Sequence, residues 1–389
     1  MGFYLKIVKT NIRKFWELRD MRVKLGELTK IQTGKLDANA SSPDGEYPFF
    51  TCSKETSRIA TYSYDCECVL VAGNGDLNVK YYSGKFDAYQ RTYIIENNSD
   101  GKLFIPYLYY FMCRYVEELR RQAVGGVIKY IKLGNLTEAL IELPDIEMQK
   151  QIVTILERVE KVINEFKELK NRLDDLVQYR FVEMFGDPVA NSKGWEQFPL
   201  YEVTEKIGSG ATPRGGKESY QSEGITLIRS MNVYDRYFEY KELAHITDQQ
   251  AKQLDNVAVK ENDVFINITG ASIARSCIVP KGILPARVNQ HVSIIRCITR
   301  RLNPVFANNM FVNNSFKRKL LAIGEANGAT RQAITKQQLE TILVIMPPLK
   351  LQNQFATFVH QIDKSKVSIQ KALDKTQTLL DSLMQQYFG

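Results

Sequence analysis

Two long stretches of the chain carry hydrophobic residues at alternating spacings of three and four. This pattern predicts helices that pack against each other along one seam. Each stretch begins just after a proline, Pro144 or Pro347, and ends at a glycine, Gly186 or Gly389. The predicted seam of the first consists of Ile152, Ile155, Val159, Val162, Phe166, Leu169, Leu173 and Leu176. The predicted seam of the second consists of Phe355, Phe358, Ile362, Ser365, Ile369, Ala372, Thr376 and Leu379. At ~1.5 Å per residue, about 38 residues form a rod of roughly 57 Å.

These two stretches belong to an internal repeat with a fixed offset of 203 residues. The repeat contains no insertion across the predicted helices, so their length is held constant. It matches Pro144 with Pro347, Gln149 with Gln352, Phe185-Gly186 with Phe388-Gly389 and, upstream, Gly125 with Gly328. A single long repeat of this kind indicates a duplicated domain and not a solenoid.

The segments that precede the two helices are also related. Each contains short strand-like runs, a helix that starts at a proline and a glycine-bearing polar turn, 125–133 or 328–336. The pattern predicts an α+β protein with two globular domains and two long helices that pack on each other as a coiled coil. The predicted boundaries are an N-terminal extension 1–20, a globule 21–143, a helix 144–186, a globule 187–345 and a helix 346–389.

Length and composition remove several classes of protein. With 389 residues, 44% of them hydrophobic and 25% charged, the chain is long enough for two or three domains with buried cores. No run approaches the ~18 consecutive apolar residues of a membrane span, and no signal segment is evident. The six cysteines are sparse, as expected in a reducing compartment. We therefore expect a soluble, cytoplasmic protein. Its net charge of +8 permits nucleic-acid binding without requiring it.

Motifs for catalysis are incomplete. Segment 208–219 resembles a phosphate-binding loop, but five residues separate Gly210 from Gly216-Lys217 where that loop has four. Glu218 also stands where the magnesium ligand should be. Segments 72–76 and 303–306 fall short of the motifs of an adenine methyltransferase. Cys66 and Cys68 are too close together for a zinc knuckle, and the three histidines form no ligand pattern. No cysteine lies in a recognisable nucleophile motif.

Three stretches resemble the specificity subunit of type I restriction-modification enzymes. They are VNQHVSIIR at 288–296, NGATRQAIT at 327–335 with IMPPLKLQNQF at 345–355, and the FGDP step at 185–188. The resemblance covers 21–389 in the family's own order of target recognition domain and helical spacer, repeated twice. Residues 1–20 have no counterpart in the second repeat, so either the native start is Met21 or this extension is an addition.

The resemblance implies a non-catalytic, DNA-binding subunit. Each recognition domain would read one half of a bipartite double-stranded target, which is asymmetric because the two globules differ in sequence. The two coiled-coil helices would pack antiparallel and fix the gap, which the rod length limits to roughly 17 base pairs. The implied partners are two modification subunits, which bring S-adenosylmethionine, and two restriction subunits, which bring ATP and magnesium. No cofactor is expected on this chain. Apolar residues beside the seam are expected to be half-exposed for docking: Leu156, Ile163, Val177, Leu373, Leu380 and Leu383.

Base-reading residues are expected on loops, because strands and helices hold variable loops in place. Arginine suits guanine, and asparagine or glutamine suits adenine. The candidates in the first globule are Thr33, Lys35, Asn74, Asn78, Lys80, Gln90, Arg91 and Lys129. The candidates in the second are Thr212, Arg214, Lys217, Arg229, Asn232, Asn267, Thr269, Arg275, Gln290, His291, Arg331 and Gln332. For Gln290 and His291, which stand at the start of a strand, we favour a structural role, with a buried glutamine that fixes the turn.

Two other classes of function remain as alternatives. The chain could be a single-chain DNA-modifying enzyme with unrecognised motifs, which binding of a methyl donor would support. It could also be a coiled-coil scaffold whose globules bind proteins, which loss of sequence-selective DNA binding in the full assembly would favour.

Overall fold

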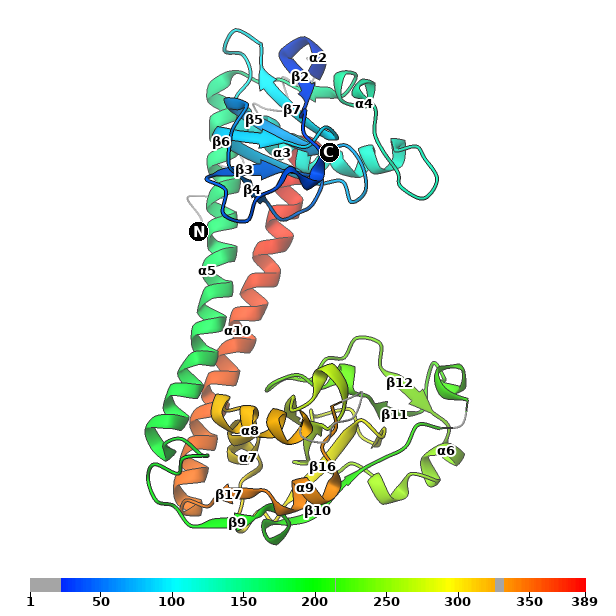
Figure 1. Ribbon diagram of the computed structural model, residues 1–389, viewed down its shortest axis with the longest axis vertical. Helices are drawn as coiled ribbons and strands as arrows, with labels where there is room; N and C mark the ends of the chain where they lie inside the picture. The colour runs from blue at the N-terminus through cyan, green and yellow to red at the C-terminus, as the bar shows by residue number, and fades with distance from the viewer. Residues whose placement is uncertain (1–21, 214, 326–331) are drawn as a thin grey trace. The chain divides into compact units, whose positions relative to one another are not determined.

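The computed structural model describes residues 22–213, 215–325 and 332–389, without the side chain of Lys217. The chain divides into two compact units, which are described separately (Figure 1). Unit 1 combines the chain up to Lys167 with Lys371–Gly389, and unit 2 is Glu168–Gln370. The extension predicted at 1–20 lies outside the described residues. In the described part of the chain, no helix is long and apolar enough to cross a membrane.

Unit 1 is built on a six-stranded sheet of order β2-β7-β5-β6-β3-β4. All neighbours pair antiparallel except β3 and β6, which are parallel. Its strands are β2 (Thr29–Thr33), β3 (Tyr47–Phe50), β4 (Ser57–Ile59), β5 (Tyr64–Ala72), β6 (Val79–Ala88) and β7 (Thr92–Asn97). The remaining elements are β1 (Arg22–Lys24), which pairs with β8 (Leu140–Glu142), and the helices α2 (Leu25–Leu28), α3 (Ile105–Gln122) and α4 (Leu133–Thr137).

Unit 2 contains a four-stranded sheet of order β10-β16-β13-β14 and a three-stranded sheet of order β12-β11-β15. Its strands are β9 (Gln197–Pro199), β10 (Thr204–Ser209), β11 (Ile225–Ile228), β12 (Ala244–Ile246), β13 (Val264–Asn267), β14 (Ser276–Ile278), β15 (Ala286–Val288), β16 (Val292–Cys297) and β17 (Leu343–Ile345). Its short helices are α6 (Asp248–Lys252), α7 (Pro304–Phe311), α8 (Asn314–Glu325) and α9 (Lys336–Thr341).

The two units share one topology. In unit 1, Phe50 of β3 pairs in parallel with Ala88 at the end of β6, and in unit 2, Ile228 of β11 pairs in parallel with Val288 of β15. The run that forms the single strand β6 is therefore divided into β14 and β15 in unit 2. Likewise, α3 corresponds to α7 and α8. The interruption between α7 and α8 follows from Asn313. Its side chain accepts hydrogen bonds at the start of α8, as that of an N-cap residue does.

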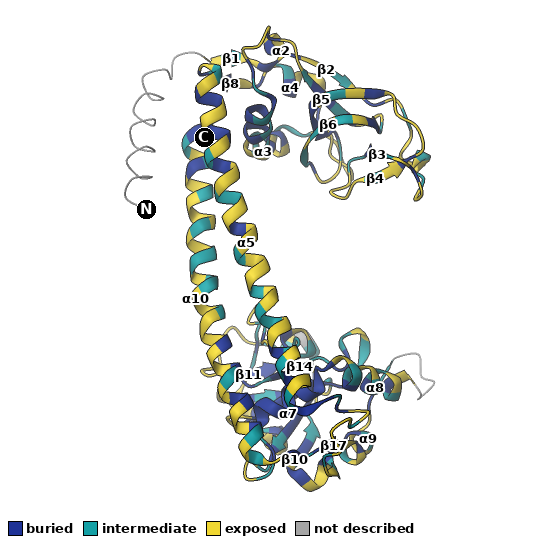
Figure 2. Ribbon diagram, turned by 90° about the vertical axis from the view of Figure 1, so that its left-hand side faces the viewer, coloured by how far each residue is buried: buried dark blue, intermediate teal, exposed yellow. Residues whose placement is uncertain are grey.

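Each unit has a core in which a helix covers the sheet. In unit 1, the apolar face of α3 packs against β5 and β7, and the run Val69–Ala72 of β5 is buried. In unit 2, Phe181 and Phe185 form an aromatic cluster with Phe306 of α7 and Phe355. Figure 2, which is coloured by burial, shows buried residues on α3 and α7. The predicted α+β class is confirmed.

The two long helices are α5 (Ile146–Phe185) and α10 (Leu349–Phe388). They run antiparallel within each unit: Ile152 shares a core with Tyr387 in unit 1, and Phe181 shares one with Phe355 in unit 2. Gly186 follows α5 with a φ of +75°, the left-handed conformation that closes many helices. A Cβ at this glycine would lie 2.3 Å from Ser192 Oγ.

The predicted seam has the wrong phase. Positions such as Ile152, Phe355 and Ile362 are buried, but Val162, Leu169, Leu176 and Leu379 are 38–49% exposed, and Ser365 is exposed as well. Buried instead are Leu156, Ile163, Val177 and Leu383, while Leu373 and Leu380 are partly buried. The observed seam keeps every second predicted position. At the positions between them it uses the next residue along the chain, for example Leu156 in place of Ile155. The residues predicted to be half-exposed for docking are therefore part of the helix pair.

The corrected seam predicts losses of stability of different size for substitutions at two neighbouring residues. Val177→Ala removes a side chain that is 1% exposed and should lower the free energy of unfolding by about 2 kcal/mol. Leu176→Ala removes more atoms but from a side chain that is 44% exposed, so it should cost less than about 1 kcal/mol. Urea unfolding of the full chain measures both. The reverse ranking would restore the predicted seam.

Candidate nucleic-acid interface

In unit 1, four chain segments meet beside the ends of β3 and β5 and the start of β7. We call this set loop cluster 1, and it comprises residues 52–53, 73–75, 90–91 and 129–131. Three backbone hydrogen bonds join it: Gly73 N–H to Arg91 O at 2.7 Å, Ile131 N–H to Gly73 O at 2.9 Å and Gly75 N–H to Lys129 O at 3.0 Å. A Cβ at position 73 would lie 2.3 Å from Arg91 O, so only glycine allows this approach.

Unit 2 repeats the same arrangement. Loop cluster 2 comprises residues 230–231, 268–270, 290–291 and 332–334. Ile268 N–H donates to His291 O at 3.0 Å, Ile334 N–H to Ile268 O at 2.8 Å and Gly270 N–H to Gln332 O at 3.0 Å. These bonds join the same three pairs of positions as in loop cluster 1, although Ile268, which has a Cβ, stands where loop cluster 1 has Gly73. The two clusters are therefore equivalent frameworks.

The side chains on this common framework differ. The matching positions hold Asn74 and Thr269, Arg91 and His291, and Lys129 and Gln332. Loop cluster 1 carries two exposed cations, Arg91 and Lys129. Neither forms an ion pair with a carboxylate within the ranges that the structure describes. The framework thus presents a positively charged set of groups in unit 1 and a largely uncharged set in unit 2.

Loop cluster 2 borders a cavity of about 620 Å³ that opens on the surface. Thr269, Arg275, His291 and Gln332, all predicted from the sequence, line it together. Thr269 Oγ1 lies 2.5 Å from His291 Nδ1, which fixes the orientation of the imidazole. Met231 and Tyr234, which sequence reasoning missed, also line the cavity. They follow β11 in the same loop as the predicted Arg229 and Asn232, but they are not polar and so were not selected.

An aromatic stack holds Arg275 in place. The guanidinium of Arg275 lies 4.4 Å from the centre of the Tyr234 ring, and Tyr234 stacks on Tyr237 at 4.9 Å with 14° between the planes. Stacking on an aromatic face leaves the edge of a guanidinium free to donate. This contact restrains the guanidinium of Arg275 at the lining of the cavity.

The structure corrects the prediction for Asn232 and Asn267, which are fully buried. Asn267 Nδ2 donates to Ser230 O at 2.9 Å, and Asn232 Nδ2 donates to Glu239 O at 3.0 Å. Both side chains hold the loop after β11 in its conformation. An amide that is buried and bonded to backbone cannot reach the edge of a base.

Three further predicted residues are also engaged by the protein. Asn78 Nδ2 donates to Cys52 O at 2.8 Å, and Lys80 Nζ donates to Ser53 O at 2.6 Å, so both support the loop at 52–53. Burial lowers the pKa of Lys80. The guanidinium of Arg229 donates to Glu242 O and lies over the Tyr220 ring. Thr33 and Lys35 are exposed at the end of β2.

Gln290 does not have the structural role that we favoured. Its side chain is exposed and accepts a hydrogen bond from Thr212. The buried amide that fixes the turn belongs to the preceding residue: Asn289 is 4% exposed, and its Oδ1 accepts from His291 N–H at 3.0 Å. In unit 1, Gln90 is likewise exposed beside Arg91. Predicted residues Arg214 and Arg331, and the side chain of Lys217, lie outside what the structure describes.

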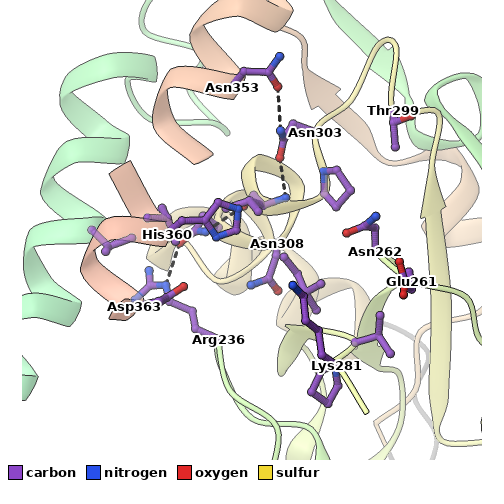
Figure 3. Close-up of a pocket in the computed structure, with 18 of the residues that line it drawn as sticks. Arg236, Glu261, Asn262, Lys281, Thr299, Asn303, Asn308, Asn353, His360 and Asp363 are labelled. Carbon is purple, nitrogen blue, oxygen red and sulfur yellow. Dashed lines mark hydrogen bonds between the residues drawn. The ribbon is translucent and has the colours of Figure 1, made fainter. Parts of the chain in front are cut away.

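A second cavity in unit 2, of about 890 Å³, lies between β14, α7 and α10 (Figure 3). Its polar groups largely bond to one another: Asn303 Nδ2 donates to Asn353 Oδ1 at 2.8 Å, and Arg236 Nε donates to Asn309 Oδ1 at 3.0 Å. Burial raises the pKa of Asp363 at this cavity. These contacts join the globular part of unit 2 to α10, and none of the predicted reading residues lies here.

Three cysteines of the described residues are poorly suited to act as nucleophiles. Burial raises the pKa of Cys66 to about 11 and those of Cys277 and Cys297 to about 12, so these thiols remain protonated near neutral pH. Among the residues that the structure places, no group of three or more His, Cys, Asp or Glu side chains could hold a metal ion.

Comparisons with known proteins define the class. The family model described as "Type I restriction modification DNA specificity domain" matches residues 20–174 and 192–377. The EcoDI type I restriction enzyme specificity subunit of Escherichia coli is 39% identical over 156 residues, which are 40% of this chain and 34% of that protein. The chain thus matches only about a third of the length of that relative. A putative MjaX specificity subunit of Methanocaldococcus jannaschii is 24% identical over 313 residues, 71% of this chain and 67% of that protein.

Solved structures agree in fold. The type I restriction-modification S subunit from M. genitalium superposes with a TM-score of 0.56 at 14% identity, over 95% of this chain and 96% of that one. A chain from a study of assembly and conformational transition of the type I R-M system has the same TM-score at 16% identity, over 95% and 97%.

The fold consists of two duplicated α+β units with equivalent loop clusters, each of which includes part of both long helices. The family match covers most of the chain in two copies, and it confirms the resemblance found in the sequence. The chain belongs to the type I restriction-modification DNA specificity family. Both matched segments correspond to the DNA specificity domain of such systems.

Proposed function

We propose that loop clusters 1 and 2 each read one half of a bipartite double-stranded DNA target. The observation that carries this proposal is the repetition of three backbone hydrogen bonds in the two units, with different side chains on the repeated framework. Base recognition requires a scaffold that is the same in both units and carries different loop side chains. Base edges are read by side chains, and phosphate contacts supply position. Because the two sets of side chains differ, the target is asymmetric.

The proposed domain organisation follows the repeat. Residues 21–143 and 187–345 are the target recognition domains, and 144–186 and 346–389 are the helical spacers. In this proposal the spacers set the length of the unspecified gap between the half-sites, because the number of residues in a helix fixes its length. A change in spacer length should alter the gap and leave the recognised bases unchanged.

We also propose that the spacers dock two modification subunits. The support comes from the exposed apolar side chains on the part of α5 in unit 2: Leu169, Leu176, Tyr179 and Val182, which are 43–73% exposed. Exposed apolar side chains of this kind favour burial against a helical partner. They replace the residues that sequence analysis selected for this role. The modification subunits would bring S-adenosylmethionine, and two restriction subunits would bring ATP and magnesium.

Methylome mapping tests the proposal. Single-molecule sequencing would compare a host that carries this chain with its cognate modification subunit and a host that carries the modification subunit alone. We expect a new methyladenine motif in two unequal parts, separated by a fixed unspecified gap. Absence of a motif from a soluble, assembled complex would contradict the proposal and favour a protein-binding scaffold. Methyl-donor binding by the purified chain alone would instead favour a modifying enzyme.

A further inference from the structure

The loop at 124–130 of unit 1 presents aliphatic side chains to solvent at the border of loop cluster 1. Val127 is fully exposed, and Ile128 is 63% exposed. Val124 and Tyr130 at the base of the loop are 45% and 38% exposed. Exposed β-branched side chains at a loop tip are unfavourable in water, so their presence calls for a contact that covers them.

The loop is held in a defined shape. Val124 N–H donates to Tyr130 O at 3.0 Å, and Tyr130 N–H donates to Val124 O at 2.9 Å. Gly125 has a φ of +119°, and a Cβ there would lie 2.6 Å from Ile128 O. The tip is therefore preorganised, which lowers the entropy lost when it makes a contact.

The same loop is tied to the groups that we propose to read DNA. Gly75 N–H donates to Lys129 O, and Ile131 N–H donates to Gly73 O, which places the tip next to Asn74. Lys129, the residue after Ile128, is an exposed cation suited to a phosphate. The tip therefore borders polar and cationic groups. These surroundings favour DNA as the partner over an apolar protein surface.

The repeat shows that this apolar tip belongs to one half-site only. The offset of 203 matches Val127 with Thr330 and Ile128 with Arg331 in the sequence, so the second copy has polar residues at these positions. A structural role common to both units would not require this difference. A role in telling one sequence from another would.

The apolar group that DNA offers to a protein at base level is the C5 methyl of thymine, which lies in the major groove. We propose that Val127 and Ile128 are specificity-determining residues that contact thymine methyl groups in the half-site read by unit 1. This inference rests on the proposed function of loop cluster 1 and names one chemical feature of its target.

The experiment is a double-mutant cycle between protein and DNA. The complex of the full chain with its modification subunit is titrated with target DNA, and each thymine of both half-sites is replaced in turn by deoxyuridine, which lacks only the methyl group. Fluorescence anisotropy gives the Kd for the wild type and for the double variant Val127→Ser/Ile128→Ser. The control is Leu140→Ser, which removes an aliphatic side chain of β8 that is 50% exposed and lies outside loop cluster 1.

We expect the wild-type complex to bind about 5- to 10-fold more weakly when one or two particular thymines in one half-site lose their methyl group. The double variant should bind the unmodified target more weakly by at least this factor and show no further loss with deoxyuridine at those positions. The Leu140→Ser complex should behave as the wild type.

Four results would overturn the inference. They are a wild-type complex that is insensitive to deoxyuridine, a double variant that keeps the full deoxyuridine effect, a half-site of unit 1 without thymine, and a double variant that no longer assembles with the modification subunit. The last would make the loop a protein contact. Each of the first three can occur while the wild-type complex still binds a bipartite target selectively. Loss of that selectivity in the wild type would instead contradict the proposed function itself.

Discussion

Replacement of Gln149 or Gln352 by leucine is expected to lower the free energy of unfolding by about 3 kcal/mol or more. Both glutamines are fully buried in the first turn of a long helix. Gln149 Oε1 accepts from Phe104 N–H, and its Nε2 donates to Lys102 O and Pro144 O, all at 2.8 Å. Leucine would leave these three backbone groups, of which Pro144 O is buried and the other two are partly buried, without partners, at roughly 1–3 kcal/mol for each buried group.

Gln352 makes the same three bonds in unit 2. It accepts from Asn303 N–H at 2.8 Å and donates to Arg301 O at 3.1 Å and Pro347 O at 2.8 Å. Each glutamine thus ties the start of a long helix to the segment that precedes the helix of its own globule. The bonds explain why the 203-residue repeat retains this residue.

The measurement is pulse proteolysis of the full chain in urea, which reports the fraction unfolded. The matched control is Gln354→Leu, two residues further along α10, where the side chain is exposed, and its effect should stay within about 0.5 kcal/mol. If Gln149→Leu and Gln352→Leu unfold at the same urea concentration as the control, the buried bonds do not support the junction as described.

Arg275→Ala is expected to weaken binding of the target by about 5- to 150-fold in the complex with the modification subunit. This range corresponds to about 1–3 kcal/mol for one bidentate contact with guanine. One position in the half-site of unit 2 should become permissive, while the half-site of unit 1 stays unchanged. Arg275→Lys should not restore selectivity, because an ammonium cannot make the two parallel bonds of a guanidinium.

Methylome mapping of the variants shows the change in motif, and anisotropy titration gives the change in affinity. Arg300→Ala is the matched control, since Arg300 is exposed and follows the end of β16, whereas loop cluster 2 lies at its start. A uniform loss of affinity without a change in motif would make Arg275 a phosphate contact. An unchanged affinity would exclude Arg275 from the interface.

Most of the architecture could be predicted from the sequence because it depends on repetition. The offset that pairs Gln149 with Gln352 also pairs the ends of the two long helices. The related segments before each helix predicted two α+β globules. Three of the four segments of each loop cluster contain candidates selected from the sequence, whereas 52–53 and 230–231 were not selected. The match of Arg91 with His291 was therefore visible as residue spacing before any contact was known.

The burial of individual polar side chains could not be predicted from the sequence repeat. Asn267 and Asn232 have the residue type of a base reader, but they lie where the loop after β11 needs partners for its carbonyl groups. Conversely, Met231 and Tyr234 have the residue type of a core, yet they line the open cavity of loop cluster 2. Residue type alone does not tell which way a loop turns.

The sequence by itself determined the duplicated order of globule and helix, the family and three of the four segments in each loop cluster, because these depend on local spacing and on the repeat. Only the tertiary structure decided the phase of the helix seam. Apolar residues stand side by side at 155–156, 162–163 and 176–177, so either side of the shared positions could face a partner. The structure buries Leu156, Ile163 and Val177. The reason is that burial of a helix face depends on where the second helix and the globule pack.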